Sequence, residues 1–149
     1  MDGNTMAAHN LMAERDCEAL TLRFFEGLDE HNAAACLACF HEEGVWERQG
    51  EPLRGHAGIL QALQKRPADR RTAHAVSNVR VERTSPTTAT VNFLLVAYEG
   101  HAPAGAPEPA ARVAGIRRCR DEMHLTGAGW KIVRKASNGL FNAASLPAA

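Results

Sequence analysis

The chain has 149 residues, of which 45% are apolar and 23% are charged, with 17 basic side chains against 17 acidic ones. That length fits one domain whose core can enclose a ligand cavity, and it excludes a second domain of comparable size. The balanced charge provides no long-range field that would attract nucleic acid or an anionic membrane surface, so neither is expected as a partner. Aromatic residues make up only 5%, and Tyr98 is the single tyrosine.

The chain shows no signal for a membrane or a metal. No apolar run approaches the ~20 residues that span a bilayer, and the first dozen residues lack the basic start and apolar centre of a secretory signal. A cytoplasmic location is therefore expected. Cys36 and Cys39 form the one close pair among four cysteines, and no further His or Cys stands at the spacing of a zinc site. We expect neither metal nor cofactor, with the cysteines buried as small apolar residues.

The first half of the chain has helical periodicity. Residues 13–28 repeat apolar side chains at helical spacing, which predicts an amphipathic helix after a flexible segment over residues 1–12. A short second helix follows, and either Asp29 or Asn32 can cap it. A third helix is predicted over residues 57–66, where the following proline ends it.

The second half is rich in β-branched residues and turn signals. Strands are predicted over about residues 72–83, 88–98, 112–125 and 130–137, in addition to a short strand over residues 45–49. Long strands joined by hairpins favour a strongly curved antiparallel meander, and helices gathered in the first half favour the α+β class. We therefore predict a cone-shaped α+β barrel, with three N-terminal helices packed in a strongly curved antiparallel sheet that leaves a cavity inside.

Six short segments have a characteristic order and spacing. They are Gly27-Leu28-Asp29, Gly44–Arg48, Leu53–Ile59, Arg66-Pro67, Thr72–Asn78 and Gly129–Ile132. Together they resemble the SnoaL-like branch of the nuclear transport factor 2-like superfamily. The resemblance implies a SnoaL-like domain over residues 13–141, followed by a flexible tail over residues 142–149. This scaffold hosts dehydratases, isomerases, cyclases and non-catalytic subunits, so the fold alone does not give the function.

Asp29 and His74 fall on the positions of a functional pair in two enzymes that the chain distantly resembles, scytalone dehydratase and lindane dehydrochlorinase. There, an Asp at the end of the first helix hydrogen-bonds a His on the strand after the third helix. A carboxylate on one ring nitrogen fixes the tautomer of imidazole and stabilises the imidazolium that forms when the ring takes a proton. The resemblance thus implies a catalytic dyad with His74 as general base. Two simpler roles stay open, Asp29 as a helix cap and His74 as a packed or surface side chain.

Other side chains are candidates for binding a substrate. Trp46 and Arg48 share a strand face, and an indole beside a guanidinium suits a planar or anionic ligand. The alternatives are a Trp that fills the cone and an Arg paired with a neighbouring acid. Asn78 lies four residues after His74, so a regular strand places both on one face. The remaining candidates for substrate binding are Asn92, Tyr98 and Asp121.

Asp121 and a group of arginines each allow two interpretations. Asp121 lies nine residues before Trp130, a spacing at which the SnoaL-like branch often carries an Asp, and a strand Asp is the proposed acid/base of its polyketide cyclase. Asp121 can equally pair with an arginine on a neighbouring strand. Three arginines just before His74 favour an anion or form a solvated helix end; they are Arg66, Arg70 and Arg71.

The shortage of tyrosine narrows the chemistry, because no tyrosine precedes Tyr98. This excludes a faithful copy of the ketosteroid isomerase or scytalone dehydratase sites, which use tyrosines from the first part of the chain. We expect a cofactor-independent lyase or isomerase, of dehydratase, dehydrohalogenase or cyclase type, that acts on a small hydrophobic or aromatic compound. The alternatives are a non-catalytic partner similar to the small (beta) subunit of ring-hydroxylating oxygenases, and a small-molecule binding protein.

A homodimer that forms through the open face of the sheet is also expected. An apolar set lies opposite in strand phase to His74 and Asn92, and such a set on an open face favours contact with a second copy. The members of this set are Val79, Val81, Val91, Phe93 and Leu95.

Overall fold

The structure is a computed structural model, and it describes residues 2–48, 50–103 and 105–141. The described residues form three helices, α1 (Gly3–Asp29), α2 (Ala33–Ala38) and α3 (Gly55–Gln64), and six strands, β1 (Phe40–Arg48), β2 (Glu51–Arg54), β3 (Arg70–Ser85), β4 (Thr88–His101), β5 (Arg112–Thr126) and β6 (Gly129–Phe141). The tail predicted over residues 142–149 lies outside the described residues. None of the helices in the described part of the chain combines the length and the apolar character that crossing a membrane requires.

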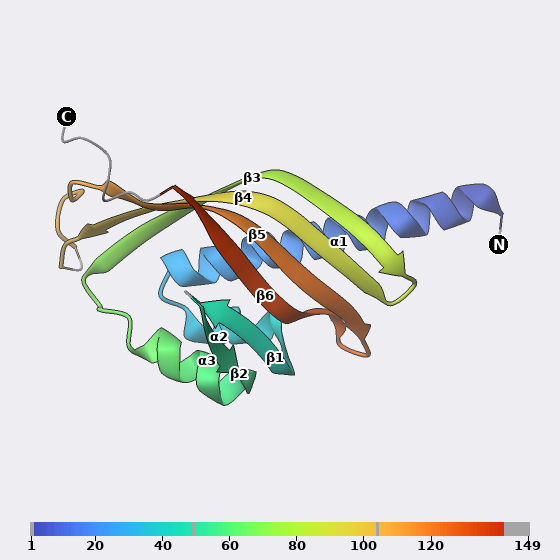
Figure 1. Ribbon diagram of the computed structural model, residues 1–149, viewed down its shortest axis with the longest axis horizontal. Coiled ribbons are helices and arrows are strands. Elements are labelled where there is room, and N and C mark those ends of the chain that lie inside the picture. Colours follow the sequence, from blue (N-terminus) through green and yellow to red (C-terminus); the bar gives the residue numbers. More distant parts are fainter. Residues whose placement is uncertain (1, 49, 104, 142–149) are drawn as a thin grey trace.

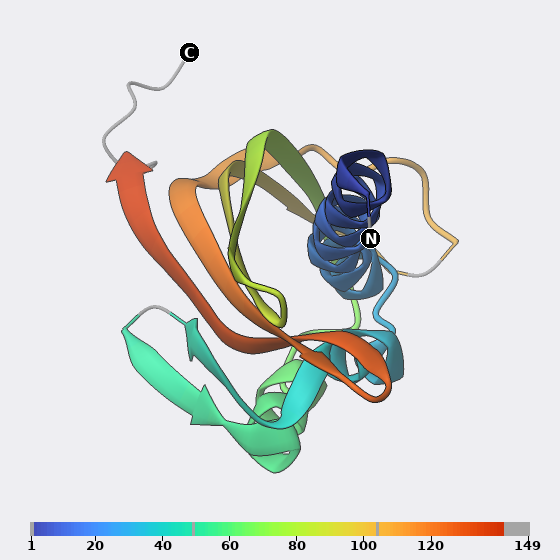
Figure 2. The ribbon, with the colours of Figure 1, turned by 90° about the vertical axis from the view of Figure 1, so that its right-hand side faces the viewer.

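The strands form one curved sheet in the order β2-β1-β6-β5-β4-β3. Strands β3 to β6 are an antiparallel meander, whereas β1 pairs with β6 in parallel. Figure 2 shows the sheet curling past α1, with α2 and α3 beside β1 and β2 at the lower end. The predicted α+β class, with three helices and a strongly curved sheet, is confirmed, and the sheet stays open rather than closing into a barrel.

Helix α1 is longer than the apolar periodicity predicts. It begins at Gly3, where the side chain of Asp2 accepts a hydrogen bond of 2.8 Å from the backbone amide of Thr5. Residues 3–12 are therefore helical, where the sequence predicted a flexible segment over residues 1–12. These turns extend beyond the sheet in Figure 1, with Leu11 and Met12 exposed. Because they have no core to face, they carry no amphipathic pattern that would have revealed the helix.

The core forms where the C-terminal half of α1 packs against the inner face of the sheet. The ring of Phe24 is fully buried and lies edge-on to the rings of Phe25, Phe40 and Trp46, at centroid distances of 5.2, 5.6 and 5.1 Å. Such edge-to-face aromatic contacts stabilise a core by about 0.5–1.5 kcal/mol each beyond the area that they bury. The end of α1 is thereby held firmly against the sheet, and that end carries Asp29.

One local feature settles an alternative that the sequence left open, and another was not predicted. The side chain of Asn32, rather than Asp29, caps α2 by accepting a hydrogen bond of 3.0 Å from Ala35. Strand β2 was not predicted; it pairs with β1 across a turn in which Gly50 has a φ of +82°. Its Pro52 fits an edge strand, where one backbone donor is not needed by a neighbour.

A β-bulge in β3 changes which side chains face the inside. The register with β4 shifts between Ser77 and Arg80, and Asn78 within it has a φ of +53°. After this extra residue, Val79 and Val81 pack against the core on the same side as His74.

The apolar set that was expected on an open sheet face is therefore in the core, and that prediction is wrong. The three members on β4 are buried as well, with exposed fractions of 0%, 2% and 6%; they are Val91, Phe93 and Leu95. On β4 the alternation of side chains assigns them to the face that covers α1. The homodimer stays a prediction without this support.

Candidate functional site

Asp29 and His74 meet where the end of α1 crosses the start of β3. The ring Nδ1 of His74 lies 2.6 Å from Oδ1 of Asp29, and the backbone amide of His74 donates to Oδ2 at 3.0 Å. The hydroxyl of Thr72 donates to Oδ1 at 2.7 Å. The two positions singled out in the sequence are thus in direct contact, and Asp29 is not needed as a helix cap.

The environment keeps Asp29 ionised. Burial raises the pKa of this carboxyl, but the hydrogen bonds from the His74 ring, the Thr72 hydroxyl and the His74 amide outweigh it, so the pKa lies below its usual value. An ionised carboxylate only accepts hydrogen bonds, so Nδ1 of a neutral His74 ring must carry the proton. The lone pair then lies on Nε2, for which no hydrogen-bond partner is present among the described residues.

A cavity of about 260 Å³ lies next to this pair, between α1, β1 and the inner face of the sheet. His74 contributes to its wall, together with apolar side chains such as Phe25, Leu28 and Leu95. The ring of Phe25 lies 5.1 Å from the ring of His74 and holds it in place. The volume is close to the lower end of the ~300–1,000 Å³ typical of small-molecule sites. His74 therefore borders a space that could hold a small ligand.

Trp46 and Arg48 both line this cavity, as the strand alternation predicts. The guanidinium of Arg48 lies 5.4 Å from the centre of the Trp46 ring, which is a cation–π geometry. Trp46 also packs against Phe24, so it fills the cone and lines the cavity at once. Arg48 forms no ion pair within the described residues, in contrast to the alternative in which a neighbouring acid neutralises it.

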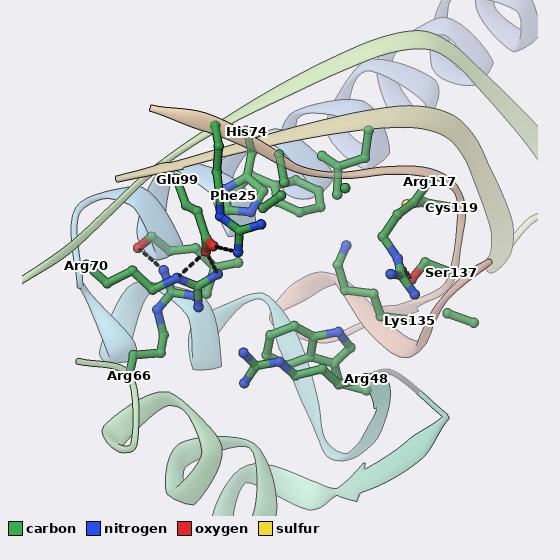
Figure 3. Close-up of a pocket in the computed structure, with 18 residues that line it drawn as sticks. Phe25, Arg48, Arg66, Arg70, His74, Glu99, Arg117, Cys119, Lys135 and Ser137 are labelled. Carbon is green, nitrogen blue, oxygen red and sulfur yellow. Dashed lines mark hydrogen bonds and ion pairs between the residues drawn. The ribbon is translucent and has the colours of Figure 1, made fainter. Parts of the chain in front are cut away.

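Glu99 forms ion pairs with two arginines that line the cavity, Arg70 and Arg112. Arg70 approaches its carboxylate at 2.8 Å, and Arg112 binds the other carboxylate oxygen. Burial raises the pKa of Glu99, but Arg70 and Arg112 outweigh this and hold the pKa below its usual value. Figure 3 shows Glu99 and Arg70 on the same side of the cavity as Arg66.

The side chains of the three arginines that precede His74 have different surroundings. Arg66 is half-buried in the cavity wall, where its Nη2 donates to the Thr72 hydroxyl at 3.2 Å. Arg71 leaves the cavity and donates to backbone carbonyls of the loop after β4, those of Pro103 and Ala106.

Asp121 is fully buried and does not line the cavity. Its two carboxylate oxygens each accept a hydrogen bond of 2.9 Å from Nζ of Lys135, and Oδ2 accepts one of 2.8 Å from Thr21. Asp121 therefore pairs across strands, as one of its two interpretations held, but with a lysine rather than an arginine. Lys135 itself reaches the cavity wall, with its ammonium 4.5 Å from the ring centres of Phe24 and Phe25.

Three predicted binding residues lie outside the cavity. Asn78 sits in the bulge of β3 with its side chain exposed, because the extra residue breaks the alternation that placed it beside His74. Asn92 is on the outer face of β4, since the residues on either side of it are core. Tyr98 pairs with Ala73 and is 42% exposed, after a register shift next to Ala97.

The cavity is also lined by residues that the sequence analysis did not predict as binding residues. Arg117 donates to the hydroxyl of Ser137 at 2.8 Å, and both line the wall together with Cys119. The alternation of side chains along a strand places Arg117, Cys119 and Asp121 on one face of β5. Because β5 contains several arginines, the sequence did not indicate which of them would line a cavity.

The thiol of Cys119 is not a nucleophile at neutral pH, because burial raises its pKa to about 11. Within residues 2–48, 50–103 and 105–141, no group of three or more His, Cys, Asp or Glu side chains is arranged to hold a metal ion.

Comparisons with known proteins agree with the fold. The family model of the SnoaL-like domain matches residues 9–136. A nuclear transport factor 2-like protein with a cystatin-like fold from Novosphingobium aromaticivorans is 23% identical, with a TM-score of 0.76 over 93% of this chain and 90% of that one. No curated protein sequence matches the chain significantly.

Two further solved structures from the same organism are similar. A candidate scytalone dehydratase is 20% identical, with a TM-score of 0.73 over 91% of this chain and 89% of that one. A candidate aromatic ring hydroxylase is 21% identical, with a TM-score of 0.75 over 89% of this chain and 92% of that one. At these identities the likeness concerns the fold.

Proposed function

This chain belongs to the SnoaL-like domain family, and on that premise we propose that it is a cofactor-independent lyase or isomerase acting on a small aromatic or hydrophobic compound. The observation that carries the proposal is the 2.6 Å contact between His74 and Asp29 at the edge of a cavity. A positioned imidazole with an ionised partner is the usual general base at neutral pH.

In the reaction that we propose, Nε2 of His74 takes a proton from a carbon of the bound compound. The electron pair of that C–H bond forms a new double bond to the neighbouring carbon. In an elimination, the leaving group departs from that neighbour with its bonding pair. A halide departs as such and His74 then releases its proton to solvent, whereas hydroxide recovers the proton from His74 and departs as water. In an isomerisation, the substrate already has a double bond at that neighbouring carbon, and the electron pair of this bond moves to its far carbon, which takes the proton back from His74. Atoms and electrons balance without a cofactor, and Asp29 stabilises the imidazolium meanwhile.

The cations around the cavity support the same chemistry. As a proton leaves carbon, negative charge develops on the substrate, and a nearby fixed positive charge lowers the free energy of that state. Lys135 stands in the wall with its ammonium oriented by Asp121, so it needs little rearrangement to act in this way.

The proposal is tested by following proton NMR spectra in D₂O with a panel of aryl ketones and aryl carboxylic acids that carry a hydroxyl or chlorine β to the carbonyl. We expect loss of the leaving group, or deuterium incorporation at the carbon that loses its proton. With any compound that reacts, His74→Gln is expected to lower the rate by about 10²–10⁴-fold.

The matched control is His124→Gln, because His124 is an exposed histidine on β5. This variant is expected to react as fast as the wild type. A panel that gives neither product nor exchange with the wild type, or a reaction that survives in His74→Gln, would contradict the proposal.

A second candidate is binding without turnover, as in a binding protein or in a partner of a ring-hydroxylating oxygenase. The cavity favours it, because it accommodates a ligand whether or not a proton moves, and one solved structure of this fold is a candidate aromatic ring hydroxylase. Ligand binding that is equal in wild type and His74→Gln, with no reaction in either, would favour this candidate.

A further inference from the structure

The cavity has a strong surplus of positive charge. Among the residues that the structure describes, six cationic side chains line the cavity, but only one carboxylate does, that of Glu99. The six are Arg48, Arg66, Arg70, Arg112, Arg117 and Lys135. The chain as a whole has no net charge, so this surplus is a local property of the cavity.

Only part of this charge is neutralised by the protein. Arg70 and Arg112 share the single carboxylate of Glu99, and Lys135 is paired with Asp121 behind the wall. The nearby carboxylate of Asp29 is engaged by His74. The remaining guanidiniums, those of Arg48, Arg66 and Arg117, have no carboxylate partner among the described residues.

Arg48 and Arg66 are the two that lack charge compensation most clearly. Arg66 donates to neutral oxygens of Leu28 and Thr72. Its Nε is buried and has no hydrogen-bond partner in the described part of the chain. Burial lowers the pKa of Arg48 and of Arg66, and repulsion from Arg70 lowers both further. Holding these cations together in a partly buried space costs free energy, and a bound anion would remove that cost.

The rest of the wall indicates what the anion is attached to. Trp46 lies beneath the guanidinium of Arg48, and Phe25, Leu28 and Leu95 add apolar surface. Figure 3 shows Arg48, Arg66 and Arg70 reaching toward one side of the cavity, with Arg117 and Lys135 on the other. A cavity of about 260 Å³ accommodates one ring with a short side chain.

From this arrangement we infer that the cavity binds a carboxylate-bearing, single-ring or similarly small unsaturated acid, whose carboxylate is held by Arg48 and Arg66. Guanidinium groups bind a planar carboxylate through two parallel hydrogen bonds, which gives both affinity and orientation. The inference deepens the proposed function and rests on it for the reaction, but the binding itself does not require turnover. With the carboxylate anchored, a proton on a carbon near it is the one that His74 would remove.

The inference is tested by titration calorimetry in a buffer free of carboxylate and phosphate. The probes are phenylacetate, trans-cinnamate and trans-3-hexenoate, each compared with its neutral carboxamide. We expect at least one carboxylate to bind about tenfold or more tightly than its amide, since the amide keeps the shape and loses the charge. Inorganic phosphate is titrated as a separate arm, because arginines also bind phosphate.

Variants locate the binding. Arg48→Gln and Arg66→Gln are each expected to weaken carboxylate binding by about tenfold and to leave amide binding unchanged. Arg66→Lys, which keeps the charge but not the planar fork, is expected to be intermediate. The matched control is Arg118→Gln, because Arg118 is exposed on β5 next to the inward-facing Arg117. Circular dichroism checks that each variant is folded.

The inference would be overturned if no carboxylate bound more tightly than its amide, or if inorganic phosphate bound more tightly than every carboxylate. It would also be overturned if Arg118→Gln weakened carboxylate binding as much as Arg48→Gln and Arg66→Gln do. His74→Gln separates this inference from the proposed function, because it is expected to bind the carboxylate as well as the wild type does. Carboxylate binding without any reaction would support the inference and contradict the proposed function. A reaction on neutral compounds alone would support the proposed function and contradict the inference.

Discussion

The carboxylate of Asp29 contacts His74 twice, at the ring Nδ1 over 2.6 Å and at the backbone amide over 3.0 Å. One contact positions the ring and the other positions the strand that carries it. Since Asp29 ends α1 and His74 lies near the start of β3, the pair also ties the helix to the sheet. The orientation of the His74 ring and the local stability therefore depend on the same carboxylate.

Asp29→Asn is expected to lower the reaction rate by about 10²–10⁴-fold. An amide that donates to Nδ1 would favour the tautomer with its proton on Nε2, and that tautomer cannot accept a proton from the substrate. Replacing a half-buried, charge-assisted hydrogen bond is also expected to lower the free energy of unfolding by about 1–2 kcal/mol. Steady-state rates and urea denaturation measure the two effects.

Glu30→Gln is the control for Asp29→Asn, because it changes the exposed carboxylate that follows Asp29 in the chain. It is expected to leave both rate and stability unchanged. If the Asp29→Asn variant catalysed the reaction as fast as the wild type, Asp29 would have a structural role only.

Lys135→Met is expected to destabilise the fold by about 3–5 kcal/mol, because it leaves the carboxylate of Asp121 buried without its cation. The neighbouring Arg134→Met removes an exposed ion pair with Glu47 and is expected to cost less than about 1 kcal/mol. Urea denaturation of both variants gives the comparison. If both variants lost the same free energy of unfolding, the ion pair between Asp121 and Lys135 would stabilise the fold no more than an exposed one.

The stability of the fold is expected to fall in acid, in part through Asp29 and Glu99. The pKa of each lies below its usual value in the folded protein, so each stabilises the fold fully above the unfolded-state pKa of about 4. This contribution is lost as the pH falls through the lower native pKa. Thermal unfolding followed by circular dichroism should show Tm falling below about pH 4, with a shallower fall in Asp29→Asn. An identical fall in that variant would contradict the assignment.

The cysteines are expected to be unreactive in the native protein. Burial raises the pKa of Cys17 and of Cys119 to about 11, and that of Cys36 to about 12. At pH 8, a thiol with a pKa of about 11 is ionised in roughly one molecule in a thousand, and the thiolate is the reactive form. A thiol reagent such as Ellman's reagent should therefore label the protein quickly only after unfolding. Rapid labelling of one native thiol would indicate an exposed, ionised cysteine.

The sequence predicted the helices and long strands well, because their apolar periodicity and turn signals are local properties. It failed where the side chains had nothing to pack against, as in the first turns of α1, and where one extra residue changed the alternation. The bulge at Asn78 is such a case: a single left-handed residue moved Val79 and Val81 from the predicted outer face into the core.

The site was predicted in part, for a related reason. The contact between Asp29 and His74 joins residues far apart in the sequence, and only the resemblance to known enzymes pointed to it. Trp46 and Arg48 followed from the alternation of a regular strand. The cationic wall could not be predicted, since the number of arginines says nothing about which of them face inward. Glu99 and Lys135 became recognisable only through the partners that the fold gives them.

The most direct measurement is the tautomer of His74, read from the ¹⁵N chemical shifts of its ring in a long-range ¹H–¹⁵N NMR spectrum. The measurement requires no substrate. For a base positioned by Asp29, we predict that the neutral ring carries its proton on Nδ1 and has a bare Nε2, and that this pattern changes in Asp29→Asn. A ring that carries its proton on Nε2, or one that is unaffected by Asp29→Asn, would contradict the role of His74 as the general base.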